Sequence, residues 1–171
     1  MDFAAHVAPG HPRYLPRGRE PWEGAFTFFR RNADRSIDET NLAERAREMA
    51  RLLDVVLQRH HQPALLIGFS SGAITAAALM ATHPGLIAGA VLLRPQSPFG
   101  EKVFPNLNGV SILILSGEDD RRRTRSDGEL LYNQLLASGA TVTWHNLPCG
   151  HDFDAQGHDI ELTRAWVAQR G

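Results

Sequence analysis

The sequence has almost no cysteine, no long apolar run and no excess of either charge. Its single cysteine, Cys149, excludes an internal disulfide and fits a reducing compartment. No stretch reaches the roughly 20 apolar residues that cross a bilayer, and residues 1–18 lack the apolar run of a secretory signal. The 18 basic and 19 acidic side chains leave a net charge of -1, which gives no electrostatic basis for binding nucleic acid or an anionic membrane. We therefore predict a cytoplasmic protein with no nucleic-acid partner and no membrane insertion.

Residues 1–40 contain many prolines and glycines, which predict little regular structure. Only short runs such as Arg13–Leu15 are candidates for a strand. Four aromatic residues in this region are too apolar for a disordered tail, and we expect them to pack on the domain or to line a pocket. These aromatic residues are Trp22, Phe26, Phe28 and Phe29.

From residue 41 onward, predicted helices and strands alternate. Apolar residues three and four apart predict a helix over residues 41–61, with Asp38 or Thr40 as its N-cap. Short apolar runs predict buried strands, and an alternating run predicts an outer strand. The predicted strands are 64–69, 87–93, 110–115 and 141–147, and the other predicted helices are 71–83, 127–138 and 159–169. This order predicts an α/β fold, a three-layer α/β/α sandwich with a mostly parallel sheet, in a single domain over residues 1–171.

The most specific motif is Gly68-Phe69-Ser70-Ser71-Gly72, at the junction of a predicted strand and a predicted helix. It matches the Gly-x-Ser-x-Gly pattern, in which a sharp strand-to-helix turn exposes a nucleophilic serine. We therefore predict that Ser70 is the nucleophile and that the Ser71 backbone N–H donates to the oxyanion. The alternative is a structural Gly-Ser turn that binds phosphate at the start of the helix.

A serine hydroxyl needs a base to take its proton, and that base needs an orienting acid. Of the eight histidines, only His151 lies in the loop between the last predicted strand and the last predicted helix. Three acids, Glu118, Asp119 and Asp120, follow the predicted strand 110–115. We predict His151 as the base and Asp120 as the acid, with Asp119 as the second candidate.

Together these residues resemble the carboxylesterase/phospholipase family of α/β-hydrolases. The likeness spans nearly the whole chain and rests on the segments 16–18, 28–31, 68–73, 116–120 and 148–151. In that family the acid stands three residues after the glycine, which favours Asp120 over Asp119. The resemblance implies hydrolysis of a small-molecule carboxylic ester through an acyl-enzyme, with no cofactor. It does not indicate the acyl group, the alcohol, or a preference for esters over thioesters.

One departure from the family concerns the oxyanion site. Its members have an early strand followed by a His-Gly segment, whose backbone amide supplies a second oxyanion donor. No such pair precedes Ser70, and His11 is followed by Pro12, which has no N–H. The early strand itself is therefore missing from this sequence, and we expect a fold abbreviated at its N-terminus, with the natural start upstream of Met1. The alternatives are a sheet that has closed over the place of the missing strand, or a strand from another chain that fills it. The alternative function is a catalytically impaired remnant that binds a ligand or a partner.

Three further features leave alternatives open. The run Arg121-Arg122-Arg123-Thr124-Arg125 is either a solvated loop or a device that steers an anionic substrate to the site. Cys149 is expected to be a packing residue. The spacing of His145, His151, Asp152, Asp154 and His158 matches no known ligand pattern, so we predict no metal. The oligomeric state is not encoded in any recognisable pattern, and a homodimer stays open.

Overall fold

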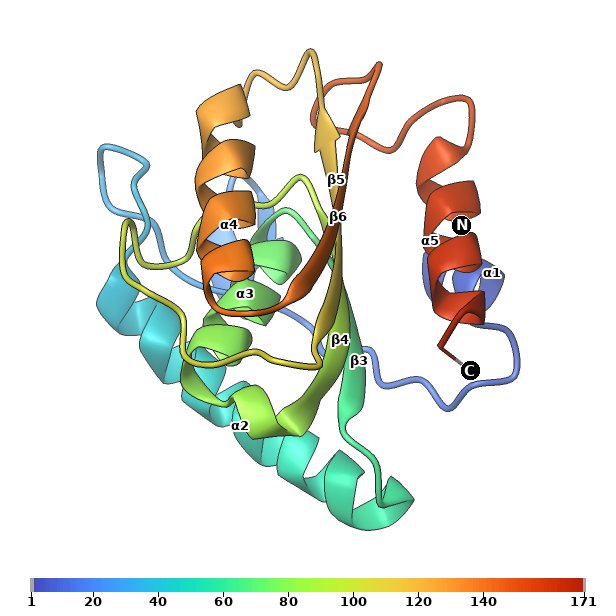
Figure 1. Cartoon of the computed structure of the whole chain (residues 1–171). Coiled ribbons are helices and arrows are strands. Elements are labelled where there is room, and N and C mark those ends of the chain that lie inside the picture. Colours follow the sequence, from blue (N-terminus) through green and yellow to red (C-terminus); the bar gives the residue numbers. More distant parts are fainter. Residues whose placement is uncertain (1, 171) are drawn as a thin grey trace.

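The protein folds into three layers, with a parallel sheet between two groups of helices (Figure 1). The structure is a computed structural model and describes residues 2–170. Its main sheet has the strand order β3-β4-β5-β6, and all neighbouring strands are parallel. The bounds of these strands are β3 Ala64–Phe69, β4 Ile87–Leu93, β5 Ser111–Gly117 and β6 Thr141–Leu147. The predicted α/β class and three-layer architecture are confirmed.

Each face of the sheet has its own apolar core, because successive side chains of a strand point to opposite faces. On one face, α2, α3 and α4 cover residues such as Leu92, Ile112 and Ile114. On the other face, α1 and α5 cover Leu93 and Leu113. The bounds of the α-helices are α1 Phe3–Val7, α2 Glu39–His60, α3 Ser71–Thr82, α4 Arg125–Ala137 and α5 His158–Ala168, and a short 3₁₀ turn, η1, spans Pro84–Leu86.

The helices begin and pack where local chemistry favours them. The Asp38 side chain accepts a hydrogen bond from the Asn41 backbone N–H at 2.9 Å, so Asp38, one of the two predicted candidates, caps α2. Thr124 and Asp127 form a reciprocal capping box at the start of α4. Helix α3 consists mainly of small residues, and nearly all of it is buried between α2 and the sheet. Within residues 2–170, no helix is both long and apolar enough to cross a membrane.

The prediction of a strand at Arg13–Leu15 is wrong. This segment is irregular and exposed, and prolines on both sides of it, Pro12 and Pro16, have no N–H to donate to a sheet. Regular structure in the first 40 residues lies instead in α1 and in a small antiparallel hairpin. Its strands are β1 (Glu20–Trp22) and β2 (Ala25–Thr27).

Strand β3 is less buried than its apolar sequence predicts. It pairs with β4 on one side and, among the described residues, with no strand on the other. Its side chain Leu65 is 36% exposed, whereas Val91 and Leu92 of the central strand β4 are fully buried. The position of β3 at the edge of the sheet explains the difference.

Candidate active site

The predicted site residues come from three loops that leave the same end of the sheet. Ser70 follows β3, Asp120 follows β5 and His151 follows β6. Backbone hydrogen bonds continue the sheet into these loops: Ser70 N–H donates to the Leu93 carbonyl at 2.9 Å, and Glu118 N–H donates to the Leu147 carbonyl at 2.9 Å. Because carboxyl ends of neighbouring parallel strands meet at one edge, residues far apart in sequence become neighbours.

Ser70 lies on a strained turn between β3 and α3. Its φ of 50° and ψ of -110° place a non-glycine residue in a region that L-residues rarely adopt. The turn is so tight that a Cβ at Gly68 would lie 2.5 Å from the backbone of Gly72. Phe28 packs beside the turn, since its ring carbon is 3.5 Å from the Cβ position of Gly72. The sequence motif therefore has the geometry of a nucleophile elbow.

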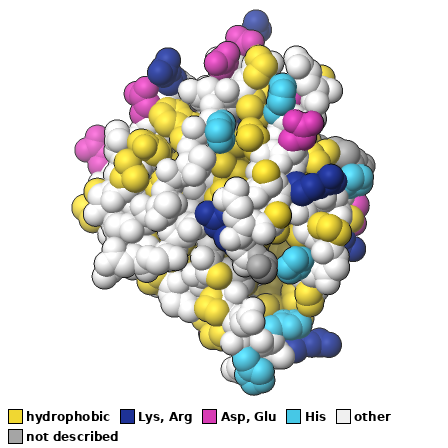
Figure 2. Space-filling model, turned by 45° about the vertical axis from the view of Figure 1, so that its right-hand side comes forward, with side chains coloured by type: hydrophobic (Ala, Val, Ile, Leu, Met, Phe, Trp, Pro, Cys, Tyr) yellow, Lys and Arg dark blue, Asp and Glu magenta, His cyan; other side chains and the backbone are white. Residues whose placement is uncertain are grey.

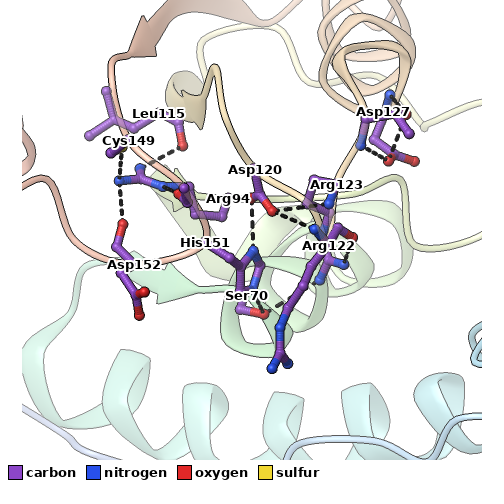
Figure 3. A network of polar contacts seen from close by, with 12 residues as sticks. Ser70, Arg94, Leu115, Asp120, Arg122, Arg123, Asp127, Cys149, His151 and Asp152 are labelled. Atoms are coloured by element: carbon purple, nitrogen blue, oxygen red, sulfur yellow. Dashed lines mark hydrogen bonds and ion pairs between the residues drawn. The ribbon is translucent and has the colours of Figure 1, made fainter.

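A chain of hydrogen bonds joins the three predicted residues (Figure 3). Ser70 Oγ is 2.8 Å from His151 Nε2, and His151 Nδ1 is 2.8 Å from Asp120 Oδ2. The other oxygen of the buried Asp120 carboxylate accepts the backbone N–H groups of Arg122 at 2.8 Å and Arg123 at 3.1 Å. Asp119 and Glu118 are exposed. Of the three acids, Asp120 is the one within hydrogen-bond reach of the histidine.

The surroundings of His151 favour a neutral imidazole. Burial lowers the pKa of His151 from its ordinary value, because the charged form loses contact with water; the hydrogen bond and charge of Asp120 raise it, and the charges of Arg123 and Arg122 lower it. The ring of Phe69 packs against the imidazole, with ring centroids 5.6 Å apart. A neutral imidazole can accept a proton from the adjacent hydroxyl at neutral pH.

The Ser71 backbone N–H is available beside the serine. Ser71 is the first residue of α3, so its N–H has no acceptor within the helix. The helix dipole adds partial positive charge at this point. The position suits the predicted oxyanion donor.

Sequence patterns did not indicate Arg94, which fixes the loop carrying His151. Arg94 directly follows β4, is 1% exposed and forms a buried ion pair with Asp159 of α5 at 2.8 Å. Its guanidinium also donates to the carbonyl of Gly150 at 3.3 Å. It donates to the carbonyl of Asp152 at 2.8 Å as well (Figure 3). These two carbonyls flank His151. Arg94 and Asp159 are 65 positions apart, so no local sequence signal could have indicated this pair.

The arginine run divides between several roles. Arg123 Nη2 lies 3.4 Å from Ser70 Oγ, whereas Arg122 pairs with Glu23 at 3.0 Å and Arg125 pairs with Glu129 at 3.0 Å. Arg121 is exposed. The prediction of a solvated loop therefore fits the exposed Arg121 and Arg125, whereas Arg123 faces the serine.

The remaining candidates lie as follows. Phe29 is buried in the core below α2, whereas Phe26 is 55% exposed, so the predicted aromatic cluster does not act as one unit. Cys149 packs at the edge of the core formed with α1 and α5, and its Sγ accepts from Arg94 at 3.1 Å. Among residues 2–170, no group of three or more histidine, cysteine or acidic side chains converges as in a metal site.

The fold and the geometry of the elbow define an α/β-hydrolase. A model of the phospholipase/carboxylesterase family matches residues 1–160, and the chain belongs to this family.

Relatives support the assignment. The putative hydrolase MhqD of Bacillus subtilis is 29% identical over 156 residues, which cover 90% of this chain and 77% of that protein. The carboxylesterase of Bacillus cereus is 29% identical, with a TM-score of 0.89 over 98% of this chain and 79% of its own. The protein Atu2452 of unknown function from Agrobacterium tumefaciens is 30% identical, with a TM-score of 0.89 over 99% and 83% of the two chains.

Proposed function

We propose that the protein is a serine esterase that hydrolyses carboxylic esters through an acyl-enzyme. The observation that carries the proposal is the hydrogen-bonded chain from Ser70 through His151 to Asp120, with Ser70 held on a strained turn. Family membership gives hydrolase chemistry, and the carboxylesterase of Bacillus cereus is a relative with the same fold. This geometry supports a nucleophilic serine, because each partner is within the reach that proton transfer requires.

In the proposed reaction, Ser70 Oγ attacks the ester carbonyl while its proton passes to His151 Nε2. Asp120 holds the imidazole through Nδ1 and stabilises its cation. The Ser71 N–H donates to the oxyanion of the tetrahedral intermediate. His151 then returns the proton to the departing alcohol, and the acyl group stays on Ser70.

Water completes the cycle. His151 takes a proton from a water molecule, whose oxygen attacks the acyl carbon, and Ser70 recovers its proton as the carboxylic acid leaves. The net reaction consumes one ester and one water, and it yields one acid and one alcohol. No electron transfer and no cofactor enters these steps.

A fluorophosphonate probe tests the proposal, because it phosphonylates activated serines. The wild-type protein should gain the mass of one probe molecule less HF, because fluoride leaves with the serine proton, and Ser70→Ala should gain none. Ser126→Ala is the matched control, since Ser126 is an exposed serine at the start of α4 and should leave labelling unchanged. If folded wild-type protein is not labelled, the chain is instead a binding domain that retains the triad. Ester hydrolysis that survives in Ser70→Ala and disappears on chelation would indicate a metal-dependent hydrolase.

A further inference from the structure

Four arginine side chains lie close enough for their charges to act on one another, and one of them, Arg123, lies beside the serine. We call Arg31, Arg35, Arg122 and Arg123 the arginine cluster. Few negative charges balance them. Glu23 contacts both Arg35 and Arg122. The carboxylate of Asp120 is already engaged by His151 and by two backbone N–H groups. The charge of Asp127 also acts on Arg123, but its carboxylate accepts from the backbone N–H and the hydroxyl of Thr124. Four guanidinium groups thus have three carboxylates near them, and two of these carboxylates are engaged elsewhere.

Arg123 is the member of the cluster that faces the nucleophile. Its Nη2 is 3.4 Å from Ser70 Oγ, and its Nη1 donates to the Arg122 carbonyl at 2.7 Å. Its backbone N–H donates to Asp120, so the main chain of Arg123 is anchored to the carboxylate that also binds His151. Its Nε is buried and finds no acceptor within residues 2–170. A buried guanidinium N–H without a partner is costly, so the side chain has unused hydrogen-bonding capacity at this position.

Arg31 adds a second positive charge that is only partly solvated. It donates to the Arg35 carbonyl at 2.8 Å and lies over the ring of Phe29, with its guanidinium carbon 5.4 Å from the ring centroid. In the part of the chain that the structure describes, neither Arg31 nor Arg123 has a carboxylate within ion-pair distance. Burial, and after it the charge of Arg31, lower the pKa of Arg123 to about 10. The two positive charges therefore repel each other, and an anion bound at Arg123 would relieve that repulsion.

We propose that Arg123, with Arg31, binds a carboxylate of the substrate beside Ser70, so that the preferred esters are monoesters of short dicarboxylic acids. This inference rests on the proposed esterase function. A carboxylate accepting from Arg123 Nη2 at about 2.9 Å lies within about 6 Å of Ser70 Oγ. An acyl chain of a few carbon atoms spans that distance. A planar guanidinium fork suits a carboxylate because it can donate two parallel hydrogen bonds.

The test compares two methyl esters whose acyl chains have the same length. Monomethyl glutarate carries a terminal carboxylate and methyl pentanoate does not, and a pH-stat follows the hydrolysis of each. In Arg123→Gln, the ratio of kcat/KM for the anionic ester to that for the neutral ester should fall about tenfold to hundredfold, as expected for loss of a hydrogen bond between charged groups. Arg123→Lys should retain part of the selectivity, because it keeps the charge and loses the fork. Arg125→Gln is the matched control, since Arg125 is 80% exposed and pairs with Glu129, and the ratio should not change.

Each outcome bears on the inference. An unchanged ratio in Arg123→Gln overturns it, and so does an equal loss for both esters, because Arg123 would then act on the reaction in general. Fluorophosphonate labelling of wild-type protein separates the two proposals: a labelled enzyme without anionic preference refutes this inference alone, whereas unlabelled and inactive protein refutes both. If Arg123→Gln does not fold, Arg31→Gln provides the same test, and a ratio equal to wild type overturns the proposal.

Discussion

The buried pair of Arg94 and Asp159 provides a sharp test of how the site is supported. Asp159→Asn removes one negative charge and nearly preserves the shape of the side chain. Asp159 accepts from both terminal nitrogens of Arg94, at 2.9 Å and 2.8 Å, and from the Asp154 backbone N–H at 2.7 Å. The two side chains are 0% and 1% exposed. Water therefore cannot replace the lost carboxylate.

The expected cost follows from leaving one charge buried alone. Removing one partner of a buried ion pair destabilises a protein by about 3–5 kcal/mol. For a chain of this size, about 3–5 kcal/mol lowers Tm by roughly 6–20 °C. Arg94→Met should cost at least as much, because the carbonyls of Leu115, Gly150 and Asp152 lose a donor as well. The double variant Arg94→Met/Asp159→Leu buries no unpaired charge, so it should be less destabilised than the sum of the single variants.

Urea unfolding followed by circular dichroism measures these free energies. Glu161→Gln is the matched control, because Glu161 is an exposed acid on the same helix, and it should change stability little. If Asp159→Asn unfolds within about 1 kcal/mol of wild type, well below the buried-pair range, the argument is refuted. Strict additivity in the double variant would also refute it, because additivity is the behaviour of sites that do not interact.

Three further predictions follow from the site. Burial lowers the pKa of His151, and only the neutral ring can act as base, so kcat/KM should fall on acidification with an apparent pKa below 6.5. Arg123→Gln should raise this apparent pKa, because the charge of Arg123 lowers the pKa of His151. Pre-steady-state and steady-state pH profiles measure both effects; an acidic limb above 6.5 in wild type, or no shift in the variant, would contradict the assignment. Gly68→Ala should destabilise the protein by about 1–3 kcal/mol and abolish probe labelling, because the new Cβ would lie 2.5 Å from the backbone of Gly72. In the control Gly72→Ala, the new Cβ meets only a ring carbon of Phe28 at 3.5 Å, so the loss of stability should be far smaller. Equal melting temperatures of the two variants would argue against the tight elbow. Burial raises the pKa of the Cys149 thiol, so iodoacetamide should alkylate it more slowly at pH 7 in folded protein than after unfolding in urea, and equal rates would count against a packing role.

The sequence predicted the main sheet well because its strands are short apolar runs separated by clear helix signals. Strands β3, β4 and β6 begin and end at the predicted residues. The candidate site was also predictable, because a Gly-x-Ser-x-Gly turn and the order of strands place Ser70, Asp120 and His151 at one edge.

Two kinds of feature could not be predicted, for physical reasons. The hairpin β1–β2 and helix α1 are too short to show a periodic pattern, and they are held by contacts distant in sequence, such as the packing of α1 on α5. The pairing of Arg94 with Asp159 joins residues 65 positions apart, so no local spacing reveals it. Which of the four arginines in residues 121–125 lies beside Ser70 likewise depends on the turn after Asp120, because the Asp120 carboxylate binds the backbone N–H of Arg123.

On the face shown in Figure 2, basic and acidic side chains are scattered among neutral and hydrophobic ones. This arrangement agrees with the balanced charge of the chain. Positive charge is concentrated instead in the arginine cluster, whose member Arg123 lies beside Ser70.

The parallel strand order also sets when the site can form during synthesis. Ser70 and Asp120 leave the ribosome well before His151 and Asp159, and these last two residues belong to the loop after β6 and to α5. The chain is made from its N-terminus at roughly 5–20 residues per second, so the serine stays without its histidine until the last strand has joined the sheet. Ser70 therefore gains its hydrogen-bond partner His151 only after β6 has been made. A truncated product that lacks β6 and His151 is expected not to react with a fluorophosphonate probe.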